Sequence, residues 1–233
     1  MARGRDALLR SIVYDKDSLA ECQQTGAGGP AMRHPQATLS LDRAVLEALG
    51  GRSIVLVGMM GAGKSSIGRR LAQALSVPFV DADLEIEAAA GMTIPEIFAS
   101  HGEPYFRTGE ARVIARLLES GPQVLATGGG AFMRQETREA VRAKGISIWL
   151  KADYEILARR IKRRSDRPML KTDNPAATLK ALIAERYPVY AEADITVVSR
   201  DVPHETIVAE IMSRLADWLG ISETADLVAG DRR

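Results

Sequence analysis

One short pattern constrains this chain more than any other feature. Residues 58–65 read Gly-Met-Met-Gly-Ala-Gly-Lys-Ser, which satisfies the motif G-x-x-x-x-G-K-[ST] in full. The apolar run at 53–57 predicts a buried strand before it, and an amphipathic pattern over 64–75 predicts a helix after it. Glycines allow a tight turn whose N–H groups face inward, and the helix adds the positive end of its dipole. The sequence therefore predicts a loop that binds phosphate groups.

The same alternation of short apolar segments and helical patterns continues through most of the chain. We expect strands at 53–57, 78–80, 123–126, 146–150 and 195–198. We expect helices at 41–49, 64–75, 84–90, 94–99, 109–119, 134–143, 154–162, 176–187 and 203–219. Gly91 and Gly102 are expected to interrupt the helical segments. Such alternation predicts an α/β fold with a parallel sheet covered by helices on both faces.

Length and composition favour one folded domain with additional segments at both ends. The chain has 233 residues, a length that suits one domain with additional segments. We expect a flexible N-terminal extension at 1–40, a domain at 41–220 and a polar tail at 221–233. Lys and Arg (31) nearly balance Asp and Glu (30), so net charge indicates neither a nucleic-acid nor a membrane partner. Cys22 is the only cysteine, which excludes an intramolecular disulfide and fits a cytoplasmic protein. No apolar run reaches the ~18 residues of a spanning helix, and no secretory signal is evident.

Two carboxylates follow the second expected strand. Asp81 and Asp83 stand where the strand ends of a parallel sheet face a ligand crevice. Asp81 would orient the water shell of a magnesium ion, and Asp83 would bind a substrate hydroxyl and take its proton. Aspartate is also a good helix N-cap, and both roles can coexist.

An arginine–glutamate pair and a run of glycines provide further candidates. Arg107 and Glu110 would share a helix face, so the carboxylate can hold the guanidinium as a receptor for a substrate carboxylate. The alternative is a surface ion pair of little consequence. Gly128–Gly130 follow a buried strand and either allow a close backbone approach with several N–H donors or form a flexible turn.

A basic segment spans residues 159–171. Seven of the thirteen residues in RRIKRRSDRPMLK are basic, which fits a solvated face, a nucleic-acid patch or a lid that closes over phosphates. Interleaved aromatic residues are absent from it and the whole chain is not basic, which argues against nucleic acid. Beside a phosphate loop, a lid that excludes water is the favoured interpretation.

These landmarks, in this order, resemble the shikimate kinase family over about residues 52–219. The matching segments are GMMGAGKSSIGRRLA from 58, DAD from 81, FRTGE from 106, GGG from 128, RPML from 167 and ERYPVY from 185. The phosphate loop alone is widespread, whereas the combination is specific. The resemblance implies strand order 2-3-1-4-5, a mobile lid, and ATP-dependent phosphorylation of shikimate to shikimate 3-phosphate in aromatic amino-acid biosynthesis. It also implies Mg²⁺ as cofactor, and we expect a monomer.

The resemblance assigns roles by position. The residues expected at ATP are Gly61, Ala62, Gly63, Lys64, Ser65, Ser66, Arg160 and Arg167. Among them Lys64 and Arg167 would contact phosphates, Ser65 would hold Mg²⁺ with Asp81, and Arg160 would stack on adenine.

The resemblance also assigns the acceptor side. The residues expected at shikimate are Asp83, Arg107, Gly129, Gly130 and Arg186. The two arginines would bind its carboxylate, Asp83 its hydroxyls, and the glycines would offer backbone donors. Lys64, Asp83 and Arg167 are the expected catalytic residues.

Other functions of phosphate-loop proteins remain as alternatives. A gluconate or nucleoside monophosphate kinase shares the loop, but a nucleotide acceptor would favour base-reading side chains over two arginines for a carboxylate. A GTPase would need the guanine-reading pattern N-K-x-D, which does not occur. A related protein without catalysis is disfavoured by the intact Lys64, Ser65, Asp83 and Arg167.

Overall fold

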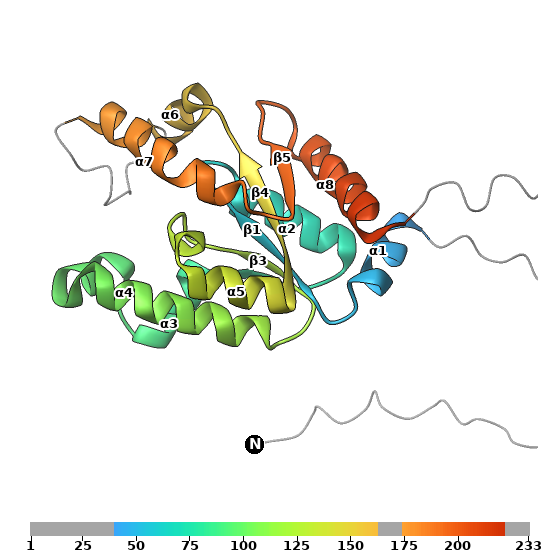
Figure 1. Cartoon of the computed structure of the whole chain (residues 1–233), viewed down its shortest axis with the longest axis horizontal. Coiled ribbons are helices and arrows are strands. Elements are labelled where there is room, and N and C mark those ends of the chain that lie inside the picture. Colours follow the sequence, from blue (N-terminus) through green and yellow to red (C-terminus); the bar gives the residue numbers. More distant parts are fainter. Residues whose placement is uncertain (1–39, 163–173, 222–233) are drawn as a thin grey trace, which may run out of the picture. The chain divides into compact units, whose positions relative to one another are not determined.

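A parallel β-sheet forms the centre of the domain (Figure 1). The computed structural model describes residues 40–162 and 174–221. The five strands lie in the order β2-β3-β1-β4-β5, and every neighbouring pair is parallel. Their bounds are Ser53–Val57 (β1), Phe79–Asp81 (β2), Val124–Ala126 (β3), Gly145–Lys151 (β4) and Ile195–Val198 (β5). The predicted α/β fold and its strand order are confirmed.

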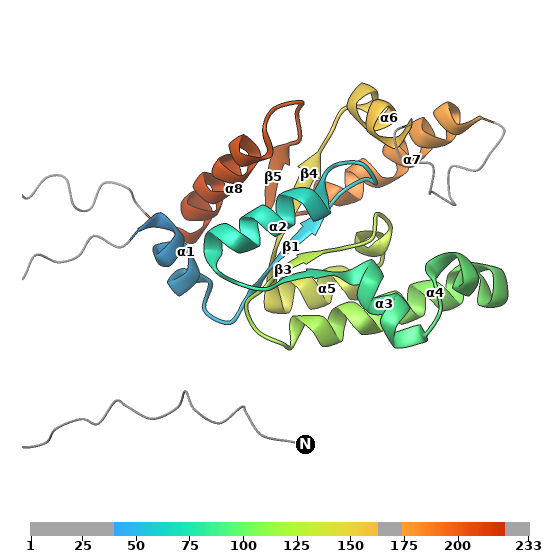
Figure 2. The ribbon, with the colours of Figure 1, turned by 180° about the vertical axis from the view of Figure 1, so that it is seen from behind.

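Helices cover both faces of the sheet (Figures 1 and 2). One face carries α1 (Leu41–Leu49), α2 (Lys64–Leu75) and α8 (His204–Leu219). The other carries α4 (Ile94–Leu118), α5 (Gln135–Lys144) and α7 (Pro175–Tyr190). Two shorter helices pack on these. Helix α3 (Ala82–Ala90) packs on α4, and helix α6 (Tyr154–Lys162) packs on α7. A 3₁₀ turn (η1, Ala131–Met133) precedes α5.

Two helices differ from the sequence prediction in ways that matter for the site. The expected break at Gly102 is present as a kink inside α4, where φ is 79° and ψ is 172°. The helix resumes directly after the kink, because Pro104 is tolerated in the first turn of a new helical segment. The sequence predicted that it resumes only at residue 109. Helix α7 runs through Pro188 to Tyr190, whereas the sequence predicted its end at residue 187, and burial of Tyr190 in the core outweighs the cost of the proline.

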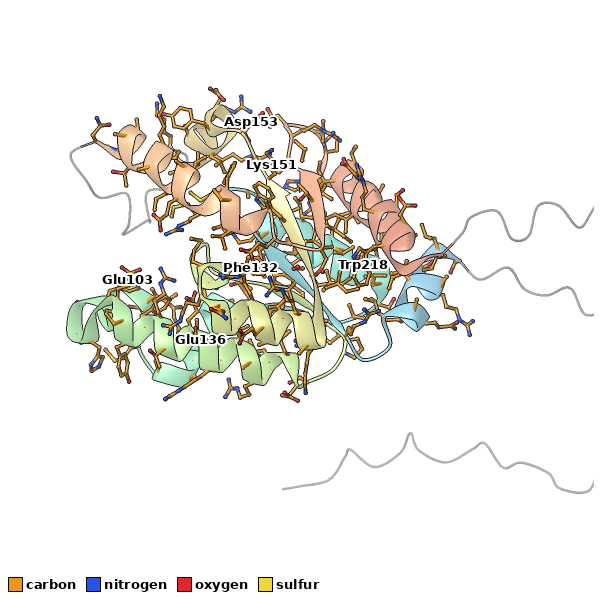
Figure 3. The ribbon with its side chains drawn as sticks, viewed as in Figure 1. Glu103, Phe132, Glu136, Lys151, Asp153 and Trp218 are labelled. Atoms are coloured by element: carbon orange, nitrogen blue, oxygen red, sulfur yellow. The ribbon has the colours of Figure 1, made fainter. Side chains whose placement is uncertain are left out.

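The core lies between the sheet and its helices. Strands β1 and β3 are buried along their whole length, as expected for central strands of a sheet covered on both faces. Phe132 is 3% exposed and lies in the middle of the domain, whereas Glu103 and Asp153 lie at its periphery (Figure 3). A separate small cluster of Ile86, Ile97 and Phe106 joins α3 to α4 and fixes the helix that carries Arg107.

Three predicted segments fall mostly outside the described residues. They are the N-terminal extension at 1–40, the tail at 221–233 and, inside the domain, the basic segment at 159–171, and these three predictions stay as they were made. Within residues 40–162 and 174–221, no helix combines the length and the apolar character that crossing a bilayer requires.

A pair of leucine substitutions measures how much the sheet contributes to stability. Leu125 in β3 is 0% exposed, whereas Leu84 in α3 is 58% exposed. We expect Leu125→Ala to lower the free energy of unfolding by about 2–5 kcal/mol, because it removes buried methyl groups and leaves a cavity. The control Leu84→Ala should change it by less than about 0.5 kcal/mol. Urea denaturation monitored by circular dichroism gives both values, and equal effects would contradict the assigned core.

Candidate active site

The phosphate loop connects β1 to α2 at the carboxyl edge of the sheet. Gly58 has φ 135°, and a Cβ there would lie 2.8 Å from the backbone oxygen of Leu150 in the neighbouring strand. Gly63 has φ 100° and stands at the N-cap of α2. These two positions require glycine, one for contact with β4 and both for positive φ. The motif therefore has the strand–loop–helix context that phosphate binding needs.

Lys64 is anchored on the loop itself. Its Nζ donates to the carbonyl oxygens of Gly58 and Met59 at 2.8 Å and 3.0 Å. This holds the ammonium group over the loop, where an incoming phosphate chain would exchange these carbonyl contacts for anionic oxygens.

Asp81 serves as a helix cap and as a partner of the phosphate loop at once. Its Oδ1 accepts from the backbone N–H of Asp83 at 3.2 Å and caps α3. Its Oδ2 accepts from the hydroxyl of Ser65 at 2.9 Å. Ser65 and Asp81 thus bring together oxygen atoms of the type that Mg²⁺ prefers.

This oxygen pair fits a magnesium ion that keeps most of its own water. Within the described residues, no group of three or more His, Cys, Asp or Glu side chains could form a dedicated metal cage. Mg²⁺ at nucleotide sites is held by one or two protein ligands, with phosphates and water completing its octahedron. Ser65 and Asp81 therefore match that ion better than a structural metal.

A cavity of about 390 Å³ lies beside the phosphate loop. Its lining includes Lys64, Ser65, Asp81, Asp83, Gly129 and Arg160. Residues of α2, β2, α3, α6 and the segment after β3 therefore face one space, although they lie far apart in the sequence.

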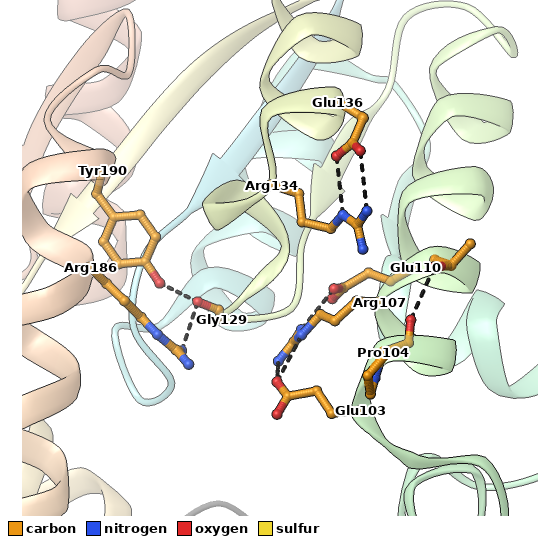
Figure 4. A network of polar contacts seen from close by, with 10 residues as sticks. Glu103, Pro104, Arg107, Glu110, Gly129, Arg134, Glu136, Arg186 and Tyr190 are labelled. Atoms are coloured by element: carbon orange, nitrogen blue, oxygen red, sulfur yellow. Dashed lines mark hydrogen bonds and ion pairs between the residues drawn. The ribbon is translucent and has the colours of Figure 1, made fainter.

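Arg107 is held in place by two carboxylates of its own helix. Its guanidinium donates to Glu110 Oε2 at 2.7 Å and to Glu103 Oε1 at 3.0 Å (Figure 4). The Arg107 side chain is 14% exposed and that of Glu110 is 1% exposed, so this is not a surface ion pair. Burial alone would lower the pKa of Arg107, but the charges of Glu110 and Glu103 outweigh it and raise that pKa. Burial raises the pKa of Glu110, against the opposing charge of Arg107.

Two glycines of the run 128–130 make room for the charged side chains around them. A Cβ on Gly128 would lie 2.7 Å from Glu110 Oε1 and 2.8 Å from Asp83 Oδ1. A Cβ on Gly130 would lie 2.6 Å from the Arg107 guanidinium. The close approach that the sequence suggested is therefore present, and a flexible turn does not explain the run.

Arg186 reaches the same glycines from the opposite side. It is 4% exposed, and its Nη1 donates to the carbonyl oxygen of Gly129 at 3.0 Å (Figure 4). Arg107 on α4 and Arg186 on α7 thus lie against adjacent residues of one loop, Gly130 and Gly129.

Arg160 and a serine that sequence reasoning missed lie beside the phosphate loop. Arg160 Nη1 donates to Ser199 Oγ at 2.9 Å, and Arg160 Nη2 donates to the Arg200 carbonyl at 2.8 Å. The Ser199 hydroxyl, 1% exposed, donates to the Ala62 carbonyl of the phosphate loop at 2.8 Å. A serine directly after a strand was the only available signal. Arg167 and residues 163–171 of the predicted lid lie outside the described residues.

A phosphate loop after the central strand of a parallel sheet, with aspartates and arginines at the same edge, defines a kinase of the phosphate-loop class. The family model described as shikimate kinase matches residues 60–216. The shikimate kinase of Rhodopseudomonas palustris is 60% identical over 201 residues, which is 86% of this chain and 95% of that protein. The shikimate kinase of Bradyrhizobium diazoefficiens is 66% identical over 171 residues, 73% of this chain and 83% of that protein.

A solved structure agrees with these relatives. The shikimate kinase from Acinetobacter baumannii, in complex with shikimate, is 38% identical and has a TM-score of 0.69, covering 71% of this chain and 93% of that one. The chain belongs to the shikimate kinase family.

Ser199 generates a prediction for nucleotide binding. We expect Ser199→Ala to raise the KM for ATP about fivefold, because Arg160 and the Ala62 carbonyl both lose a hydrogen-bond partner. Ser147→Ala is a matched control, since its hydroxyl is 2% exposed and makes two hydrogen bonds with Asp194. Steady-state kinetics should show the ATP effect in the first variant alone. Equal KM values for ATP in both variants would exclude the proposed contribution.

Proposed function

We propose that this protein transfers the γ-phosphoryl group of ATP to a hydroxyl of shikimate, forming shikimate 3-phosphate and ADP. The observation that carries the proposal is the pair Arg107 and Arg186, which flank Gly129–Gly130 beside a cavity shared with the phosphate loop. Membership of the shikimate kinase family supports it.

The acceptor side has one pole for each kind of group on shikimate. The acceptor carries a carboxylate and three hydroxyls on a ring. Arg107 and Arg186 supply planar donors for the carboxylate. Asp83, which approaches Gly128, supplies an acceptor for hydroxyls and would orient the attacking oxygen and receive its proton. A ligand held at both poles has its reacting hydroxyl fixed relative to the phosphate loop.

The nucleotide side supplies charge stabilisation. Lys64 would contact the β- and γ-phosphates after leaving the carbonyl oxygens that it now contacts. Ser65 and Asp81 would hold Mg²⁺, which when bound neutralises charge on the phosphate oxygens. Arg160 would contact the nucleotide beside Ser199, and Arg167 would approach the phosphates from the lid. Phosphoryl transfer depends mainly on such positioning and electrostatics.

An acceptor comparison tests the proposed function. ADP release by the purified protein is measured with Mg²⁺ and ATP in the presence of shikimate, quinate, gluconate or a nucleoside monophosphate. We expect ADP release with shikimate to exceed that with the others, and EDTA to stop it. Faster turnover of gluconate or a nucleotide would reject the proposed acceptor while keeping the kinase class. The proposal includes a cytoplasmic monomer with one Mg²⁺ per subunit, which light scattering, cell fractionation and metal analysis address.

Arg107 tests the carboxylate anchor. Arg107→Lys keeps the charge but loses the planar fork that contacts Glu110 and Glu103 together. We expect kcat/KM for shikimate to fall by about 10-fold or more, with the KM for ATP changed less than about twofold. Arg43→Lys, in an exposed ion pair with Glu47 on α1, is the matched control. Initial rates are measured with each substrate varied in turn. If both variants behaved as wild type, the assignment of Arg107 to the carboxylate would be contradicted.

Lys64 tests the phosphate contact. We expect Lys64→Ala to lower kcat by about 100-fold or more, because a cation is lost where charge develops during transfer. The fold should remain, since Lys64 Nζ donates to two carbonyl oxygens of the loop and its side chain is not part of the buried core. Lys144→Ala, at the end of α5 in an ion pair with Glu119, controls for loss of a lysine elsewhere. Circular dichroism accompanies the rate measurement, and a folded, fully active Lys64→Ala protein would refute the role.

A further inference from the structure

A buried tyrosine hydroxyl lies next to the acceptor site. Tyr190, in the last turn of α7, is 0% exposed, and its hydroxyl donates to the carbonyl oxygen of Gly129. The same oxygen accepts from Arg186 Nη1 at 3.0 Å (Figure 4). Arg186 and Tyr190 are four residues apart on one helix, so they share a face and reach the same atom. The carbonyl is thereby fixed by two donors from a single rigid element.

Fixing this carbonyl also fixes a backbone donor. The peptide group between Gly129 and Gly130 is planar and trans, so its oxygen and its N–H point in opposite directions. When Tyr190 and Arg186 hold the Gly129 oxygen, they set the direction of the Gly130 N–H. Gly130 lies against the Arg107 guanidinium, within the proposed carboxylate site. Glycine residues restrain their own backbone least, so this orientation needs an outside partner.

The surroundings of Tyr190 keep its hydroxyl protonated and hold it in one position. Burial raises the pKa of Tyr190 to about 12, against the opposing charge of Arg186, so the phenol stays protonated at neutral pH. Its ring lies 6.0 Å from that of Trp149, and its oxygen lies 4.0 Å from the sulfur of Met59 in the phosphate loop. The hydroxyl thus stands at the junction of the acceptor site, α7 and the phosphate loop.

We infer that Tyr190 is a positioning residue for the acceptor. Its hydroxyl holds the Gly129 peptide so that the Gly130 N–H and Arg186 present their donors to the acceptor carboxylate in a fixed arrangement. This inference deepens the proposed function and rests on it. With Arg186 alone, the Gly129 peptide would be held by one long side chain and could still rotate with it. The second donor, on the rigid ring of Tyr190, removes that rotational freedom.

The chain offers a matched control for this inference. Tyr187 lies on the same helix, its hydroxyl donates to the carbonyl of Ala152, and its ring lies 5.0 Å from that of Trp149. Tyr187→Phe and Tyr190→Phe therefore each remove one phenol-to-carbonyl hydrogen bond beside the same tryptophan, but only the second bond ends on the glycine run. Both substitutions keep the ring and its packing.

The experiment compares the two variants with wild type in the shikimate-dependent ADP-release assay. For Tyr190→Phe we expect the KM for shikimate to rise about five- to tenfold, the effect of one hydrogen bond, with the KM for ATP within about twofold. For Tyr187→Phe we expect both KM values within about twofold of wild type. Thermal unfolding midpoints and calorimetric binding of shikimate accompany the kinetics, and the midpoints of the two variants should fall by similar amounts.

The outcomes separate the positioning role from the proposed function. If wild type is active with shikimate and Tyr190→Phe matches Tyr187→Phe in both KM values, the positioning role is overturned alone. If the KM for ATP rises as much as that for shikimate, Tyr190 is merely structural and the inference is again overturned. If wild type neither binds shikimate nor releases ADP with it, the proposed function fails, and the acceptor role of Tyr190 fails with it.

Discussion

The register of three parallel strands determines where the chemistry lies. Asp81 at the end of β2 pairs with Ala126 of β3, which pairs in turn with Leu56 of β1. Because all strands run in the same direction, the residues that follow them meet at one edge. That edge therefore receives the phosphate loop after β1, Asp81 at the end of β2 with Asp83 just beyond it, and the glycine run after β3. The shared cavity and the contact between Ser65 and Asp81 both follow from this alignment.

A second constraint is the crowding of charge around the glycine run. Glu110 is buried beside Asp83, whose negative charge makes the ionised form of Glu110 less favourable. Arg107 offsets this by its ion pair with Glu110, so the cation has a stabilising role before any ligand arrives. The space for these groups exists only because residues 128 and 130 carry no Cβ. Backbone close approach and side-chain electrostatics are thus one arrangement at this site.

Much of this arrangement could be predicted from the sequence because its signals are local. The phosphate loop, the strands and the break at Gly102 each depend on neighbours in the chain, and the pair Arg107–Glu110 depends on helical spacing. The continuation of α7 through Pro188 could not be predicted in the same way, because packing of Tyr190 in the core outweighs local preference. The sequence around Ser199 indicated almost nothing about its role, because that role depends on contacts with Ala62 and Arg160, which are distant in sequence.

The two arginines of the proposed acceptor site, Arg107 and Arg186, also differ in how far their partners lie along the chain. Arg107 is oriented by Glu103 and Glu110 of its own helix, so its direction is set by secondary structure and would survive small movements of the glycine run. Arg186 is oriented by a carbonyl of that run, which it shares with Tyr190. A movement of Gly129 would therefore act on Arg186 more directly than on Arg107. In the proposed function, the geometry between the two guanidinium groups would favour a planar carboxylate, and the Gly129 peptide group contributes to that geometry. The glycine run and the last turns of α7 thus form one connected unit at this edge of the sheet.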